Sequence, residues 1–107
     1  MSIEFGVLRD GSSITLMGEY RLDLSEFELA ELRPLLSRIE FLTGEEFDPY
    51  GSAQLAGQSL AEFIAELERT QQSREHMNSI ATALVGELLR IARFANATGK
   101  PLVYFGE

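Results

Sequence analysis

Residues 43–51, TGEEFDPYG, place three carboxylates and two aromatic rings around two glycines, in a stretch without helical or strand periodicity. Closely spaced carboxylates can hold a hard cation such as calcium or magnesium. An EF-hand loop, however, needs ligands at alternate positions, a central glycine and a closing glutamate, and the spacing of Glu45, Glu46 and Asp48 does not supply them. We therefore expect no metal site in this stretch.

The same stretch can instead recognise a protein. Exposed rings beside carboxylates suit a surface that buries aromatic side chains while it pairs with a partner's Arg or Lys. The candidate partner-binding residues are Glu45, Glu46, Phe47, Asp48 and Tyr50. A connector would look similar, because Phe47 can anchor in the core, Asp48 and Pro49 can start a turn, and the carboxylates can be solvated. Most loops carry no site, so we favour the connector, yet this stretch remains the best candidate surface.

Catalytic signatures are weak in this chain. His76 is the only histidine, and its nearest hydroxyls, Ser73 and Ser79, lie one turn away on the same predicted helix. There is no cysteine, which removes thiolate catalysis, disulfides and cysteine metal sites. Phosphate-binding glycine motifs are absent, and an acid–base pair drawn from 17 Asp and Glu carries no information without geometry. We expect no enzyme and no cofactor, and we interpret His76 as a residue at the edge of the core.

The charge balance bears on partners. Seventeen Asp and Glu against nine Lys and Arg give a net charge of -8, which repels phosphate backbones and anionic lipid. We expect a basic protein partner rather than nucleic acid or membrane. Acidity can also serve only to keep a protein soluble. The first residues do not resemble a signal peptide and no apolar run is long enough to span a bilayer, so a cytoplasmic location is expected.

The first and last segments predict a sheet. Ile3, Phe5 and Val7 alternate with other residues up to Asp10 and Gly11, a two-residue turn that predicts a hairpin with Val7 opposite Ile14 and Phe5 opposite Leu16. Residues 102–105, LVYF, form a short strand that is apolar on both faces. We expect this strand to lie within the sheet or under a covered face, and to pair with the hairpin.

Helices are predicted between these strands. Ser25 and Glu28 match a capping box, and the helix they open should end near residues 43–44, with a kink or break at Pro34. Ser59 and Glu62 repeat the capping spacing for a second helix, which ends at the polar run 70–73 and follows a loose turn over residues 53–56. On this helix Glu62 and Glu66 are expected on a solvated face.

A third and longest helix is predicted over residues 74–98, closed by Gly99 and Pro101. Its outer face carries small residues, Ser79, Ala83 and Gly86, which form a candidate helix-packing or dimer face. Glycine inside a helix costs about 1 kcal/mol relative to alanine, so close approach of another element would explain Gly86. We favour the helix over residues 60–67 as that element, with a second subunit as the alternative.

These predictions combine into one α+β domain over residues 1–107, in which an N-terminal β-hairpin and a C-terminal strand form a small sheet covered on one face by three to four helices. The favoured function is a non-catalytic binding protein that holds a basic protein through its acidic loop, with carboxylates of Glu26 to Glu31 contributing. Small acidic inhibitors and immunity proteins follow this plan, a comparison by charge and size only. The alternative is a homodimer with a structural or small-ligand-binding role.

Overall fold

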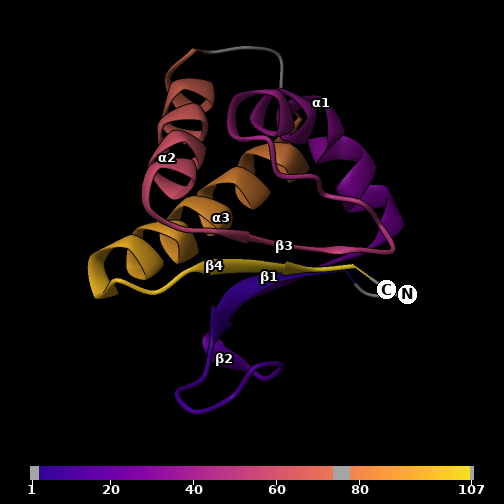
Figure 1. Ribbon diagram of the computed structural model, residues 1–107. Helices are drawn as coiled ribbons and strands as arrows, with labels where there is room; N and C mark the ends of the chain where they lie inside the picture. The colour runs from indigo at the N-terminus through magenta and orange to yellow at the C-terminus, as the bar shows by residue number, and fades with distance from the viewer. Residues whose placement is uncertain (1–2, 74–77, 107) are drawn as a thin grey trace.

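The computed structural model describes residues 3–73 and 78–106 and has an α+β architecture. Three helices lie on one face of a four-stranded sheet (Figure 1). The α+β class and the helices on one face are as predicted, and the sheet has one strand more than the predicted hairpin and C-terminal strand supply. The strands run antiparallel in the order β2-β1-β4-β3. In chain order the elements are β1 (Ile3–Leu8), β2 (Leu16–Leu24), α1 (Glu26–Thr43), β3 (Ser52–Leu55), α2 (Gly57–Gln72), α3 (Ser79–Thr98) and β4 (Leu102–Phe105).

The last strand occupies an inner position in the sheet. Tyr104 on β4 lies opposite Phe5 on β1 and opposite Ala53 on β3, which confirms that the C-terminal strand pairs with the hairpin. Burial on both sides accounts for its continuous apolar run. The turn predicted over residues 53–56 is wrong, because β3 forms there. Buried Ala53 and Leu55 alternate with exposed neighbours in β3, a pattern too short to distinguish a strand from a loop.

The predicted hairpin register is also wrong. Phe5 lies opposite Leu22 rather than Leu16, and Leu16 lies opposite Leu8, with an irregularity between Gly6 and Leu8. The turn at residues 10–11 does form, since the Ser12 amide donates to the Arg9 carbonyl. The Ser12 hydroxyl then accepts from the amides of residues 14 and 15, which draws the chain out of the ladder.

Helix α1 positions most of the candidate surface. The Ser25 and Glu28 capping box is present, and the helix ends at Gly44, whose φ of 78° is the left-handed conformation that glycine adopts readily. Pro34 does not split the helix. Leu32 and Leu36, on either side of the proline, are both buried in the core, so packing holds the two halves in one helix.

The other two helices differ from prediction at their starts. Helix α2 begins at Gly57, and Ser59 closes its first turn by bonding both the amide and the carbonyl of Ala56. Helix α3 begins after Asn78, which accepts a hydrogen bond from the Ala81 amide, and it ends at Gly99 as predicted. Residues 74–77, including His76, lie outside the described residues.

Candidate functional site

The segment between α1 and β3, residues 44–51, is called the connector here. Phe47 is its anchor: the side chain is fully buried, with its ring centroid 5.5 Å from that of Phe5 and 5.3 Å from that of Tyr104. The expectation that this ring is exposed to a partner is therefore wrong. Its burial agrees with the other interpretation of the sequence, in which Phe47 anchors the stretch in the core. Tyr50 lies on the surface, with 73% of its area exposed.

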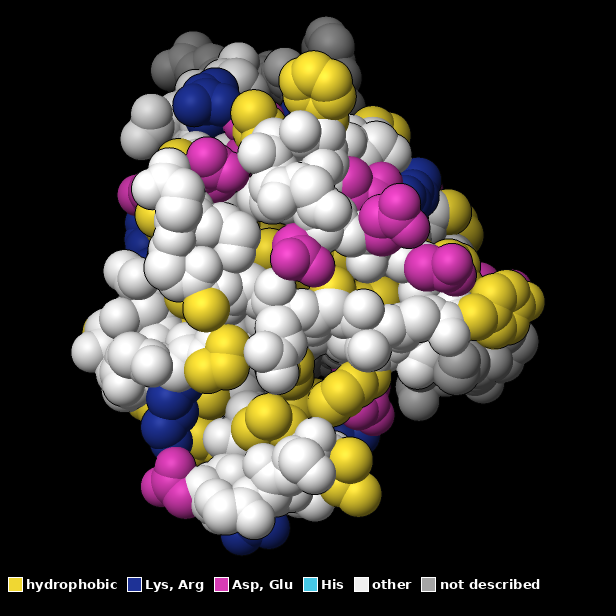
Figure 2. Space-filling model, in the orientation of Figure 1, with side chains coloured by type: hydrophobic (Ala, Val, Ile, Leu, Met, Phe, Trp, Pro, Cys, Tyr) yellow, Lys and Arg dark blue, Asp and Glu magenta, His cyan; other side chains and the backbone are white. Residues whose placement is uncertain are grey.

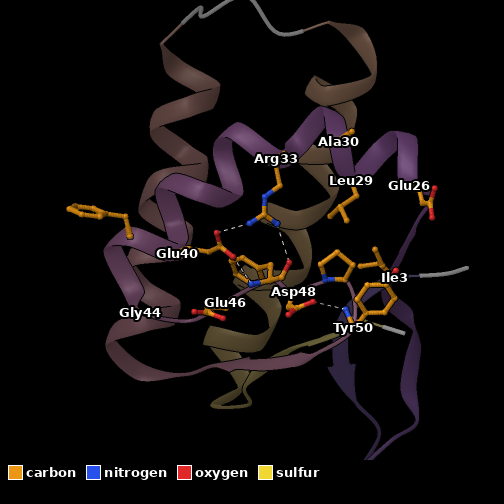
Figure 3. Close-up of a pocket in the computed structure, with 13 residues that line it drawn as sticks. Ile3, Glu26, Leu29, Ala30, Arg33, Glu40, Gly44, Glu46, Asp48 and Tyr50 are labelled. Carbon is orange, nitrogen blue, oxygen red and sulfur yellow. Dashed lines mark hydrogen bonds and ion pairs between the residues drawn. The ribbon is translucent and has the colours of Figure 1, made fainter.

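Two charged residues of α1 hold the connector in place. Arg33 donates through Nη1 to the Phe47 carbonyl at 3.0 Å and through Nη2 to Glu40 Oε1 at 2.6 Å. The second carboxylate oxygen of Glu40 accepts from the Phe47 amide at 2.7 Å. Figure 3 shows Arg33 reaching from α1 toward the connector. Sequence reasoning missed this pair, although a spacing of seven places both residues on one helix face.

The backbone around Asp48 is also fixed. The Tyr104 hydroxyl donates to the Asp48 carbonyl at 2.9 Å, and the Asp48 carboxylate accepts from the Tyr50 amide at 2.9 Å. Burial of the Tyr104 side chain raises the pKa of its hydroxyl, which favours the protonated donor. The Gly106 amide donates to the Gly51 carbonyl at 2.7 Å. The connector is thus bonded to α1, to β4 and to the residue that follows β4.

Between α1 and the connector lies an open groove of about 1100 Å³. Glu26 stands at one end and Glu46 near the other (Figure 3), so the two acidic segments singled out in the sequence border one concave surface. Exposed Phe41 and Tyr50 belong to its lining. The lining residues are Ile3, Glu26, Leu29, Ala30, Arg33, Glu40, Phe41, Gly44, Glu46, Phe47, Asp48, Pro49 and Tyr50.

The negative charge that no cation neutralises is concentrated in this region. Within the part of the chain that the structure describes, the carboxylates outside any ion pair are Glu19, Glu26, Glu28, Glu31, Glu45, Glu46, Asp48 and Glu62. All but Glu19 and Glu62 belong to residues 26–48. Three of these six, Glu26, Glu46 and Asp48, line the groove, and we call these three the acidic surface. Glu28 instead accepts a hydrogen bond from the Ser25 amide, and Glu31 accepts one from the Asn78 side chain. Figure 2 shows acidic side chains across the upper half of the molecule, over α1, α2 and the connector.

Elsewhere the carboxylates are mostly compensated. Glu66, expected on a solvated face, is buried at 5% exposure and accepts from both Arg38 and Arg69. Arg93 pairs with Glu68 on α2. Over residues 3–73 and 78–106, no group of three or more acidic or histidine side chains is arranged to hold a metal ion.

The small-residue face of α3 is not packed as favoured from the sequence. Ser79 and Ala83 are exposed, and a Cβ atom at Gly86 would meet no described residue of another element within 4 Å. The prediction that the helix over residues 60–67 approaches Gly86 is therefore wrong. The alternative, that a second subunit covers this face, stays a prediction. None of the described helices is long and apolar enough to cross a membrane.

Comparison with known proteins gives a likeness of fold. No protein-family model matches the chain, and no curated protein matches its sequence. A solved structure, the Neisseria DNA mimic protein DMP12, superposes with a TM-score of 0.74 at 16% sequence identity. The match covers 98% of this chain and 99% of that one, so the two proteins share the whole fold.

Proposed function

We propose that this chain is a non-catalytic binding protein whose acidic surface occupies the DNA-binding surface of a basic protein. The observation that carries the proposal is the concentration of carboxylates outside ion pairs within residues 26–48, on a helix and a connector fixed to the core. Recognition residues held on rigid elements need little ordering when a partner binds.

Electrostatics explains why such a surface can replace DNA. Proteins that bind DNA neutralise its phosphates with Lys and Arg, and this charge term supplies most of their non-specific affinity. A fixed set of carboxylates offers the same cations charge-assisted hydrogen bonds. The net charge of -8 adds long-range attraction that speeds association with a basic protein.

The likeness of fold supports the same choice of partner. The solved structure that this chain resembles is called a DNA mimic protein, and its fold is shared over nearly the whole chain. A DNA-binding protein is therefore the partner class that we infer. A basic nuclease toxin, the partner of an immunity protein, is one member of that class.

A release assay tests the proposal. Host lysate is loaded on immobilised duplex DNA, and the column is then washed with the purified chain at physiological salt. We expect the wild type to release a DNA-binding protein, and the variant Glu26→Gln, Glu46→Gln, Asp48→Asn to release much less. The matched control is Glu19→Gln, Glu62→Gln, Glu87→Gln, which removes the same charge outside the acidic surface.

The outcomes separate specific mimicry from bulk charge. Equal release by both variants would show that total charge acts, and not the acidic surface. No release by the wild type would remove the DNA-binding partner class. Polyglutamate of similar charge, which should release less of the protein, controls for simple ion exchange.

A further inference from the structure

The groove between α1 and the connector has two exposed aromatic rings in its lining, Tyr50 and Phe41, and three carboxylates outside ion pairs line the same groove. At one end Tyr50 lies beside Asp48, whose carboxylate accepts from the Tyr50 amide, and Glu26 lines the same groove. Toward the other end Phe41, in the last turn of α1, is 89% exposed, and Glu46 follows a few residues later. A ring next to a carboxylate suits a guanidinium, which stacks on the ring and pairs with the acid.

The middle of the groove has a different character. Arg33 lies there with its guanidinium bound to Glu40 and to the Phe47 carbonyl, and Leu29 and Ala30 also line the groove. A second cation beside Arg33 would be repelled, whereas an apolar side chain would not. The groove therefore favours positive charge at its ends and apolar atoms between them.

The separation of the two ends sets the length of the occupant. Glu26 and Phe41 are fifteen positions apart on α1, which corresponds to about 22 Å at about 1.5 Å per residue. An extended chain advances about 3.3 Å per residue and covers that length in about seven residues.

We propose that the groove binds an extended segment of the partner, with an arginine at each end stacked on Tyr50 or Phe41 and apolar side chains between. Charge complementarity with Glu26, Glu46 and Asp48 selects this occupant over an apolar helix or a second copy of the chain. The inference rests on the proposed function for the identity of the partner, and it adds that affinity does not come from charge alone. Part of the binding comes from the two rings and persists at high salt.

The test uses a capped synthetic peptide of about eight residues, with arginines about seven positions apart and Leu and Ala between them. One control peptide replaces both arginines by citrulline, and another places the two arginines side by side. Binding is followed by amide chemical shifts of the isotope-labelled full chain. We expect shifts at groove residues, including Ala30, Glu46 and Tyr50, and binding at least about threefold weaker for either control peptide.

Variants of the chain locate the contacts. Tyr50→Ala and Phe41→Ala should each lower the affinity for the peptide about three- to fivefold, and this factor should change little with salt. Asp48→Asn should lower the affinity for the peptide most at low salt. Ile14→Ala, at an exposed apolar residue far from the groove lining, should bind as the wild type does. The amide spectrum of each variant confirms that it is folded.

Several results would overturn the inference. These are shifts spread over Glu19 and Glu62 instead of the groove, equal binding of the peptide with adjacent arginines, or groove shifts that depend on protein concentration without peptide. The last result would assign the groove to a second copy. If the column assay releases a DNA-binding protein but the groove peptide fails, the proposed function stands and this inference falls. If the peptide binds in the groove but no DNA-binding protein is released, this inference stands and the proposed function falls. The partner would then be a basic protein outside the DNA-binding class.

Discussion

Arg33 and Glu40 form an ion pair of 2.6 Å that also holds both backbone groups of Phe47, since one residue donates to its carbonyl and the other accepts from its amide. The pair lies seven residues apart on α1 and is partly exposed. Its structural importance therefore comes less from the Coulomb attraction, which solvent weakens, than from the two backbone groups that it satisfies.

Glu40→Ala tests this role. The variant leaves the Phe47 amide without its acceptor and Arg33 without its carboxylate, so we expect the free energy of unfolding to fall by about 1–3 kcal/mol. Glu40→Gln, which keeps an acceptor, should lose less. Urea unfolding measures the free energy, and hydrogen exchange of the Phe47 amide measures local opening. An unchanged exchange rate of the Phe47 amide in Glu40→Ala would show that the Arg33–Glu40 pair does not hold the connector in place.

Truncation of Phe47 should lower the stability of the fold far more than truncation of Tyr50. Phe47→Ala removes a fully buried ring from the aromatic cluster, and we expect a loss of about 3–5 kcal/mol in the free energy of unfolding. Tyr50→Ala removes a ring that is 73% exposed, and its effect on stability should stay within about 0.5 kcal/mol. Thermal or urea unfolding compares the two. A large loss for Tyr50→Ala would mean that this ring is structural and not available to a partner.

The sequence predicts those features of the fold that neighbouring residues determine. The Ser25 and Glu28 capping box and the closing glycines at positions 44 and 99 depend on local hydrogen bonds and on left-handed backbone, so they can be recognised from residue types. The hairpin register depends on Leu22, seventeen residues from Phe5, and on the Ser12 hydroxyl. Local patterning favoured the nearer Leu16 because both leucines satisfy the alternation.

The candidate site divides in the same way. Residue types alone singled out Glu45, Glu46, Asp48 and the carboxylates from Glu26 onward. That these two segments border one groove depends on how α1 packs against the sheet, which no local pattern reveals. The burial of Phe47 was open in the sequence, since an aromatic residue in a loop serves equally as an anchor or as a contact.

Gly86 offers a stabilising substitution and a test of the α3 face. A Cβ atom there would meet no described residue of another element, so Gly86→Ala should gain about 0.5–1 kcal/mol from the better helix propensity of alanine. Urea unfolding at low protein concentration measures the gain. Light scattering at high concentration, run in parallel, checks the dimer prediction. A loss of stability, or of an assembly present in the wild type, would indicate that another chain approaches this glycine.

Alkaline pH should destabilise the fold through Tyr104. Burial raises the pKa of this hydroxyl in the folded protein, so the unfolded chain loses the proton first. Stability from this group is present below about pH 10 and falls as the pH rises toward the folded pKa. Tyr104→Phe, which lacks the bond to the Asp48 carbonyl, should be less stable at neutral pH but should lose less stability above pH 10. Urea unfolding between about pH 8 and 11 compares the two proteins. Parallel curves would contradict the assignment.

Gly106 links the end of the sheet to the candidate site by close approach. A Cβ atom at this position would lie 2.5 Å from the Pro49 carbonyl oxygen and 2.7 Å from those of Asp48 and Gly51. Gly106→Ala must therefore displace the connector or the chain end, and either movement weakens the bond from the Gly106 amide to Gly51.

We expect Gly106→Ala to shift the amide signals of the connector and to lower the free energy of unfolding by about 1–3 kcal/mol. It should also lower the affinity for the groove peptide, although it removes none of the side chains that contact the peptide. Gly18→Ala is the matched control, because a Cβ atom there meets no described residue within 4 Å. Amide spectra and peptide titrations of the two variants give the comparison. Unchanged connector amides in Gly106→Ala would show that the chain end moves alone. Peptide binding should then equal that of the wild type, because the geometry of the groove depends on the connector and on α1.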